Sequence, residues 1–233
     1  MKKVKPVTII ALHGWIYSTK KWQPFIKQLK KYNINLKLLN TPGLTAPIKQ
    51  PMTLDNYVAW LSEKLLLKTS IILLGHSFGG QIATRFTATH PNKVKQLILI
   101  DSSGLRDNSF LSTAKRNFFL ALTKLGKTIT KNPKAKKLVY KLARETDYAQ
   151  ATPIMQQTMT VILKDQVRSD LPKITTPTLI IWGQKDAITP HKFARYFHKH
   201  LTNSQLKIIP TAFHAPHFTH PQKTAQIINQ FIT

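Results

Sequence analysis

Six short apolar runs rich in Ile, Leu and Val recur along the chain. They lie at residues 7–12, 36–39, 71–74, 97–100, 178–182 and 206–209. A continuous apolar run of this length is typical of a strand that is buried on both faces, as in a parallel sheet. The pattern therefore predicts six buried strands.

Segments with helical periodicity separate most of these runs. Between Leu54 and Leu65, apolar residues recur at steps of four, three and four, and Thr53 can cap the first turn. A second such segment begins at Pro221, a residue type favoured in the first turn of a helix. Alternation of strands and helices predicts an α/β fold with a mostly parallel sheet flanked by helices on both faces.

The alternation is interrupted once, between the fourth and fifth strands. Three helical patterns lie there, at 111–129, 135–143 and 154–163. We therefore expect residues 104–172 to form an inserted helical cap, and residues 1–103 and 173–233 to form one α/β core. A cap placed over the carboxyl ends of parallel strands would cover the position where open α/β sheets bind ligands.

The chain is strongly basic, with 35 Lys and Arg against 9 Asp and Glu and a net charge of +26. The excess is spread over all three predicted segments, whereas nucleic-acid modules concentrate it on one arm or patch. We therefore expect no specific nucleic-acid partner. Residues 115–144 are an exception, with ten basic residues and no acidic one, and they leave weak association with anionic surfaces open.

Composition excludes several further classes of protein and kinds of site. There is no cysteine, which excludes disulfides, thiolate metal sites and cysteine nucleophiles. No apolar stretch approaches the about 18 residues that span a bilayer, and the opening MKKVKPVTIIAL has too short an apolar run for a signal peptide. A cytoplasmic protein is the expectation. The nine histidines show no metal-ligand spacing, so we expect no metal and no cofactor.

A glycine-flanked serine follows the third apolar run directly. Gly75, Ser77 and Gly79 form a G-x-S-x-G pattern between IILL and the helical segment QIATRFTATH. A serine that projects from a sharp strand-to-helix turn needs small residues two positions away on either side, because a β-carbon there would collide. This context predicts that Ser77 is a catalytic nucleophile.

A serine nucleophile needs a base, and the base needs a carboxylate to orient it. Asp186 is the one acidic residue between 171 and 233 and lies just past a predicted strand. It fits the chain order of serine, acid and histidine that accompanies this type of turn. Asp101, at the end of the fourth strand, is the alternative acid.

Three histidines follow the last predicted strand in PTAFHAPHFTH. His214 stands five residues past the strand, where a base is expected, and is the preferred candidate. His217 lies further from the strand end, and His220 directly precedes Pro221, where its side chain would be used locally. His76, beside the nucleophile, is expected to point away from it and to brace the loop.

Acyl transfer also needs donors for an oxyanion, which two backbone N–H groups commonly supply. We assign one to Phe78, the residue after the serine, and one to Trp15 in the loop after the first strand. Gly14 would let that backbone approach closely. The alternative is that His13 and Gly14 merely turn the chain.

Six motifs in order carry a family resemblance that covers nearly the whole chain. They are LHGW at 12–15, NTPGL at 40–44, GHSFGG at 75–80, HPNKVKQLILIDSSG at 90–104, ITTPTLIIWGQKDAITP at 174–190 and FHAPHFTHP at 213–221. The chain resembles serine hydrolases of the α/β-hydrolase fold with a short helical cap. The resemblance implies Ser77, Asp186 and His214 as a triad. It also implies a sheet of six strands, because the family's first two strands are missing.

These observations predict a cofactor-free serine hydrolase, a carboxylesterase acting on small or medium acyl esters. Hydrolysis of thioesters or carbon–carbon bonds uses the same residues and remains an alternative. A basic membrane- or polyanion-binding protein with vestigial catalytic residues is the alternative from another class. Five apolar cap residues are candidates for the acyl pocket, although packing within the helices is an equal alternative for them: Phe118, Phe119, Leu122, Met155 and Met159.

Overall fold

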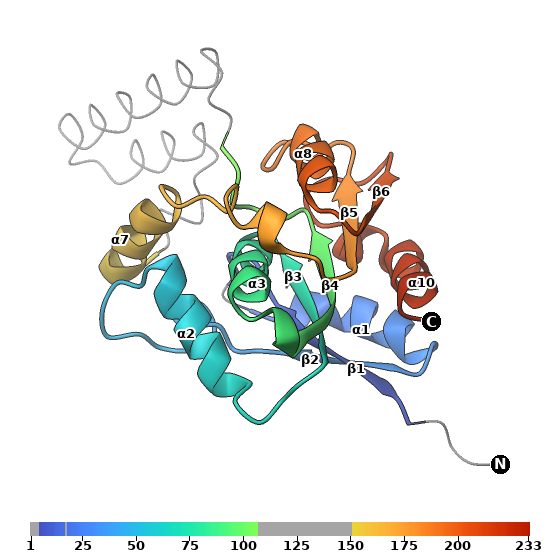
Figure 1. The fold of residues 1–233 in the computed structure, drawn as a ribbon, viewed down its shortest axis with the longest axis horizontal. Coiled ribbons are helices and arrows are strands. Elements are labelled where there is room, and N and C mark those ends of the chain that lie inside the picture. The colour runs from blue at the N-terminus through green and yellow to red at the C-terminus, as the bar shows by residue number, and fades with distance from the viewer. Residues whose placement is uncertain (1–4, 17, 107–150) are drawn as a thin grey trace.

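A computed structural model describes residues 5–16, 18–106 and 151–233, and one six-stranded sheet organises them (Figure 1). The strands are β1 (Val7–Leu12), β2 (Ile34–Leu38), β3 (Ile71–His76), β4 (Val94–Ile100), β5 (Thr178–Gly183) and β6 (Ser204–Ile209). Their order is β2-β1-β3-β4-β5-β6, and each neighbouring pair is parallel. The six predicted strands and the predicted α/β fold are confirmed.

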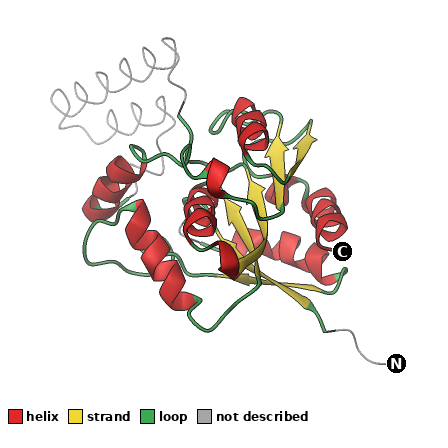
Figure 2. Ribbon diagram, in the orientation of Figure 1, coloured by secondary structure: helices red, strands yellow, loops and turns green. Residues whose placement is uncertain are grey.

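Helices cover both faces of this sheet (Figures 1 and 2). The α-helices are α1 (Gln23–Lys30), α2 (Leu54–Lys64), α3 (Phe78–Thr89), α7 (Pro153–Ile162), α8 (Lys192–His200), α9 (Pro216–Thr219) and α10 (Pro221–Ile232). Short 3-10 turns are η1 (Lys20–Trp22), η2 (Pro91–Lys93) and η3 (Leu171–Lys173). One core cluster joins the sheet to α2, α3 and α8, and the other joins it to α1 and α10. Among the described residues, no helix has the length and apolar character to cross a membrane.

Burial differs between the middle and the edges of the sheet. β3 and β5 are buried at every position, as the continuous apolar runs predict. The edge strands β2 and β6 instead alternate between more and less buried positions, so the prediction of burial on both faces was wrong for them. An edge strand has a neighbour on one side alone, and helices shield it less completely.

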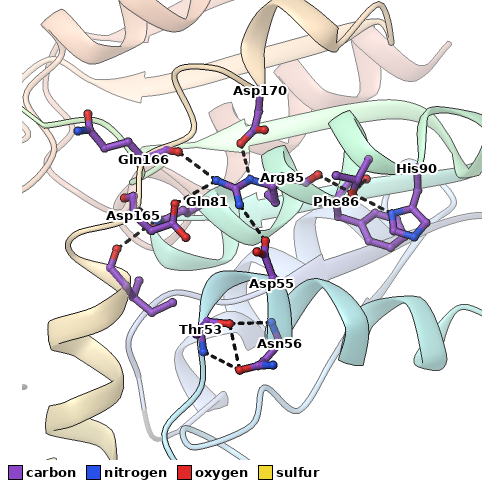
Figure 3. A network of polar contacts seen from close by, with 12 residues as sticks. Thr53, Asp55, Asn56, Gln81, Arg85, Phe86, His90, Asp165, Gln166 and Asp170 are labelled. Atoms are coloured by element: carbon purple, nitrogen blue, oxygen red, sulfur yellow. Dashed lines mark hydrogen bonds and ion pairs between the residues drawn. The ribbon is translucent and has the colours of Figure 1, made fainter.

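The predicted helix boundaries hold where the chain is described. Thr53 caps α2 through a capping box, in which its hydroxyl accepts from the amide of Asn56 and the Asn56 side chain accepts from the amide of Thr53 (Figure 3). The helix predicted at 154–163 is α7. The other two helices predicted for the cap lie outside the described residues, so the boundaries of the cap stay a prediction.

Two glycines allow β3 and α3 to lie in direct backbone contact. A β-carbon on Gly75 would collide with the carbonyl oxygen of Gly79, and one on Gly79 would collide with the carbonyl of Leu12. Both obstacles are backbone atoms, which cannot rotate away as a side chain can. The chain therefore reverses from strand to helix within a space that no side chain can enter.

Gly79→Ala is expected to lower the melting temperature by several degrees, because the added methyl group forces α3 away from the end of β1. Thermal unfolding followed by circular dichroism measures this shift. Thr89→Ala, at an exposed position in the last turn of the same helix, is the matched control and should leave the melting temperature nearly unchanged. Equal melting temperatures for the two variants would contradict the assigned packing.

Candidate active site

Ser77 lies in the turn between β3 and α3 in a backbone conformation that non-glycine residues rarely adopt, with φ of 52° and ψ of −118°. Such a conformation costs about 1–3 kcal/mol and persists where the surroundings impose it. Here the amide of Ser77 donates to the carbonyl of Ile100 at 3.0 Å, and its own carbonyl accepts from Gly80 and Ser103. The side chain is thereby presented at the carboxyl end of the sheet.

A chain of two hydrogen bonds links three residues that are far apart in the sequence. Nε2 of His214 lies 3.0 Å from Oγ of Ser77, and Nδ1 of His214 lies 2.8 Å from Oδ2 of Asp186. Both lengths are within hydrogen-bond reach for a nucleophile, a base and an orienting acid. The structure therefore brings together the three side chains predicted to act as a triad.

Asp186 is held by more than the imidazole. Its Oδ1 accepts from the amides of Ile188 and Thr189 at 2.8 and 3.0 Å, and the Thr189 hydroxyl donates to Oδ2 at 2.7 Å. Burial on its own would raise the pKa of Asp186, but the hydrogen bond and charge of His214 and the donors from Thr189 and Ile188 outweigh it. The pKa of Asp186 is therefore lowered, and its carboxylate stays ionised at neutral pH.

Asp101, the alternative acid, has a different environment. Its carboxyl is fully buried, and Oδ1 accepts from the amide of Gly183 at 2.8 Å. Burial raises the pKa of Asp101 well above its ordinary value, and the nearby Asp186 carboxylate raises it further. Asp101 is therefore harder to ionise than Asp186 and is less suited to stabilise an imidazolium.

The other candidate histidines are engaged elsewhere. His217 is fully buried, and its ring packs 4.5 Å from that of Trp22. Nε2 of His220 lies 2.9 Å from the Thr211 hydroxyl, which is the local use expected for it. His76 is buried, and its Nε2 donates to the carbonyl of His214 at 2.9 Å, so it braces the loop as predicted.

The predicted oxyanion donors are Trp15, in the loop after β1, and Phe78, at the start of α3. A β-carbon on Gly14 would come within 2.9 Å of Cβ of Ser77, so the loop after β1 passes directly over the serine. Trp15 and Phe78 both line the cavity at Ser77, and their rings pack 5.0 Å apart. Phe78 is the first residue of α3, where a backbone N–H has no partner within the helix.

A cavity of about 440 Å³ opens onto Ser77 and His214. Its walls are mainly apolar and include the following side chains from the described residues: Trp15, Phe78, Leu105, Met159, Ile162, Leu163, Ile188, Phe193 and Phe218. Met159 therefore lies where the acyl pocket was predicted. Met155 does not line this cavity, because it packs in the core against Gly43. Phe118, Phe119 and Leu122 lie outside the described residues.

Several polar residues of the site were not identified from the sequence. Gln81, Ser103 and Asp165 line the cavity, and Thr189 holds Asp186. The Asp-x-x-Thr spacing of DAIT is a recognisable turn pattern that could have revealed Thr189. Gln81 is a polar residue among buried residues of α3, and such a position is a weaker signal of a functional role. No cluster of three or more metal-binding side chains is present in the described ranges.

Comparison with known proteins agrees with this architecture. The family model for the alpha/beta hydrolase fold matches residues 7–221. The chain belongs to the α/β-hydrolase fold family. It is a hydrolase, as the sequence analysis predicted, and its parallel sheet flanked by helices matches that fold.

Individual relatives extend over nearly the whole chain. A pimeloyl-[acyl-carrier protein] methyl ester esterase of Wigglesworthia glossinidia brevipalpis is 30% identical, over 97% of this chain and 93% of the relative. An enzyme of the same name from Legionella pneumophila (strain Paris) is 29% identical, over 96% of this chain and 94% of the relative. Among solved structures, an alpha/beta hydrolase from a Medee basin deep-sea metagenome library has a TM-score of 0.76 at 22% identity, over 100% and 91% of the two chains.

The buried histidines beside the site predict a loss of stability in acid. Burial, with a smaller contribution from the charge of His214, lowers the pKa of His76 from 6.5 to about 3, and burial lowers that of His217. Because the unfolded chain binds more protons below pH 6.5, the free energy of unfolding should fall as the pH drops from about 6.5 towards about 3. The charge of His13 lowers the pKa of His76 a little further, whereas the Asp186 carboxylate and the hydrogen bond to the carbonyl of His214 oppose the shift.

His217→Phe should make that decline shallower, because the phenyl ring fits among the surrounding aromatic rings and takes up no proton. Chemical denaturation at a series of pH values measures the slope. His198→Gln, at an exposed position on α8, is the control and should follow the unmodified protein. An unchanged slope in His217→Phe would show that this buried histidine does not contribute.

Proposed function

We propose that this hydrolase is a cofactor-free carboxylesterase that uses Ser77 as nucleophile, His214 as general base and Asp186 as orienting acid. The observation that carries the proposal is the Ser77–His214–Asp186 hydrogen-bond chain at the end of a mainly apolar cavity. The fold alone would not support the proposed reaction, because one fold supports many reactions.

The geometry supports a two-step acyl transfer. His214 takes the proton of the Ser77 hydroxyl while Oγ attacks the ester carbonyl, and then gives that proton to the departing alcohol. The amides of Trp15 and Phe78 stabilise the negative charge on the carbonyl oxygen. Water, activated by the same imidazole, then hydrolyses the acyl-enzyme and releases the acid. Asp186 stays ionised throughout and stabilises the imidazolium.

The walls of the cavity favour a hydrocarbon acyl group. Its polar residues already bond to the protein, because Gln81 donates to two carbonyls, Ser103 donates to Gln81 and Asp165 accepts from Arg85. A polar substituent on the acyl chain would lose water beside these three residues without gaining a partner from them. The same machinery acts on thioesters and carbon–carbon bonds, so oxygen esters are the proposal and those two classes are its alternatives.

The relatives suggest how the acyl chain is presented. Several are named pimeloyl-[acyl-carrier protein] methyl ester esterases. We propose by extension that the substrate of the present chain is a methyl ester of an acyl group attached to an acyl-carrier protein. The net charge of +26 would attract an anionic carrier and raise the association rate. Weak association with other anionic surfaces remains a prediction of the same charge.

Ser77→Ala should abolish hydrolysis of p-nitrophenyl esters, with a loss of kcat of about 10⁴-fold or more, because the nucleophile is removed. It should also prevent covalent labelling by a fluorophosphonate probe, followed by mass spectrometry. Ser62→Ala, on α2, is the matched control and should keep full activity and labelling. A folded protein that neither hydrolyses esters nor forms an adduct at Ser77 would favour the vestigial alternative.

The KM for a methyl ester borne on an acyl-carrier protein should rise with ionic strength, because salt screens the attraction between the basic enzyme and its carrier. The KM for neutral p-nitrophenyl butyrate should stay constant over the same salt series. Steady-state kinetics at increasing sodium chloride concentration measures both. Equal salt dependence for the two substrates would argue against electrostatic recognition of the carrier.

A further inference from the structure

Three carboxylates converge on the guanidinium of Arg85 in α3 (Figure 3). Nη1 donates to Asp55 at 2.8 Å, Nη2 to Asp165 at 3.0 Å and Nε to Asp170 at 2.6 Å. The whole chain holds nine acidic residues, so one arginine engages a third of them. Neither the proposed reaction nor the motifs of the sequence explain this concentration of negative charge.

The contacts of Arg85 differ in burial. The side chain of Arg85 is 15% exposed, that of Asp170 is 5% exposed and that of Asp55 is 78% exposed. A hydrogen-bonded ion pair shielded from water contributes more than an exposed one, which contributes little. Burial would lower the pKa of Arg85, but Asp170 and the other carboxylates outweigh it and raise the pKa. The Asp170 contact is therefore the strong one, and the Asp55 contact is the weak one.

Arg85 acts on the segment that follows α7. Besides Asp165 and Asp170, it donates to the carbonyl of Gln166 at 3.1 Å. Gln81 stands four residues earlier in α3 and so shares a face of the helix with Arg85. Its amide donates to the carbonyls of Ile162 and Asp165 at 3.4 and 3.2 Å. One face of α3 thus holds the end of α7 and the turn after it.

The held segment is a wall of the cavity. Ile162, Leu163 and Asp165 line the cavity that opens onto Ser77, whereas Arg85 itself is not part of the lining. α3 begins directly after Ser77. The nucleophile and the contacts that fix this wall therefore belong to one rigid helix, and the distance between them is set by its geometry.

We infer that Arg85 is a specificity-determining positioning residue, which fixes the 162–165 wall relative to Ser77 and so sets the binding of longer acyl chains. This inference rests on the proposed esterase function. A short acyl group stays near the reacting atoms and does not need that wall. A longer chain lies along the wall and loses contact when the wall shifts. Lysine cannot replace arginine fully, because a single ammonium group cannot direct a planar fork at several acceptors.

The test compares p-nitrophenyl acetate with p-nitrophenyl octanoate in Arg85→Met. The octanoate should lose about 10-fold in kcat/KM, mainly through a higher KM, because contacts along the acyl chain are lost. The acetate should keep its kcat and KM. Arg85→Lys should restore the octanoate activity in part. A purely structural role would lower the melting temperature and reduce both substrates by the same factor, and that result would overturn the inference.

A matched pair of variants serves as the second measurement and decides the question if Arg85→Met does not fold. Asp170→Asn weakens the buried contact and should raise the KM for octanoate but not for acetate. Asp55→Asn weakens the exposed contact to the same guanidinium, away from the cavity, and should change neither. If both variants keep the acetate-to-octanoate ratio of the unmodified protein, the inference fails. If the unmodified protein hydrolyses neither ester, the proposed function itself fails.

Discussion

The tight reversal of the chain at Ser77 is the constraint on which the rest of the site depends. Gly75 and Gly79 let β3, α3 and the end of β1 meet with no side chain between them. That contact holds Ser77 in its unusual backbone conformation. It also brings the loop with Gly14 over the serine, so the positions of the proposed oxyanion donors and of the proposed nucleophile are set by the same packing.

The site also depends on the different environments of two buried carboxyl groups. Asp186 and Asp101 both follow strands of the sheet and both are buried. Asp186 has four hydrogen-bond donors around it, so its ionised form is stabilised. Asp101 has one such donor, the amide of Gly183, and burial together with the neighbouring Asp186 carboxylate outweighs it, so the pKa of Asp101 is raised. Two chemically identical side chains are thus suited to different roles by their surroundings.

Much of the fold and of the candidate site followed from local patterns. The six apolar runs located the six strands, and the spacing around Ser77 identified the turn because its steric requirements are local. The burial of β2 and β6 was predicted wrongly, since an apolar run does not reveal its place in the sheet. For Met155 the sequence left pocket lining and helix packing as equal alternatives, because helical periodicity cannot separate a residue facing a cavity from one facing the core. No local sequence pattern reveals the contacts of Arg85, because its partners lie 30, 80 and 85 residues away in the sequence.

The order of the candidate catalytic residues along the chain could be read from the sequence. Ser77 lies in a small-residue turn, Asp186 is the one carboxylate in the last quarter, and three histidines follow the final strand. These are properties of neighbouring residues and of composition. Tertiary structure alone decided which of two acids and three histidines meets the serine, and which side chains form the wall of the cavity. Those choices depend on contacts between segments far apart in the sequence, such as Ser77 and His214 at 137 residues and Gln81 and Ile162 at 81 residues. Sheet packing and burial set these distances, and local spacing does not.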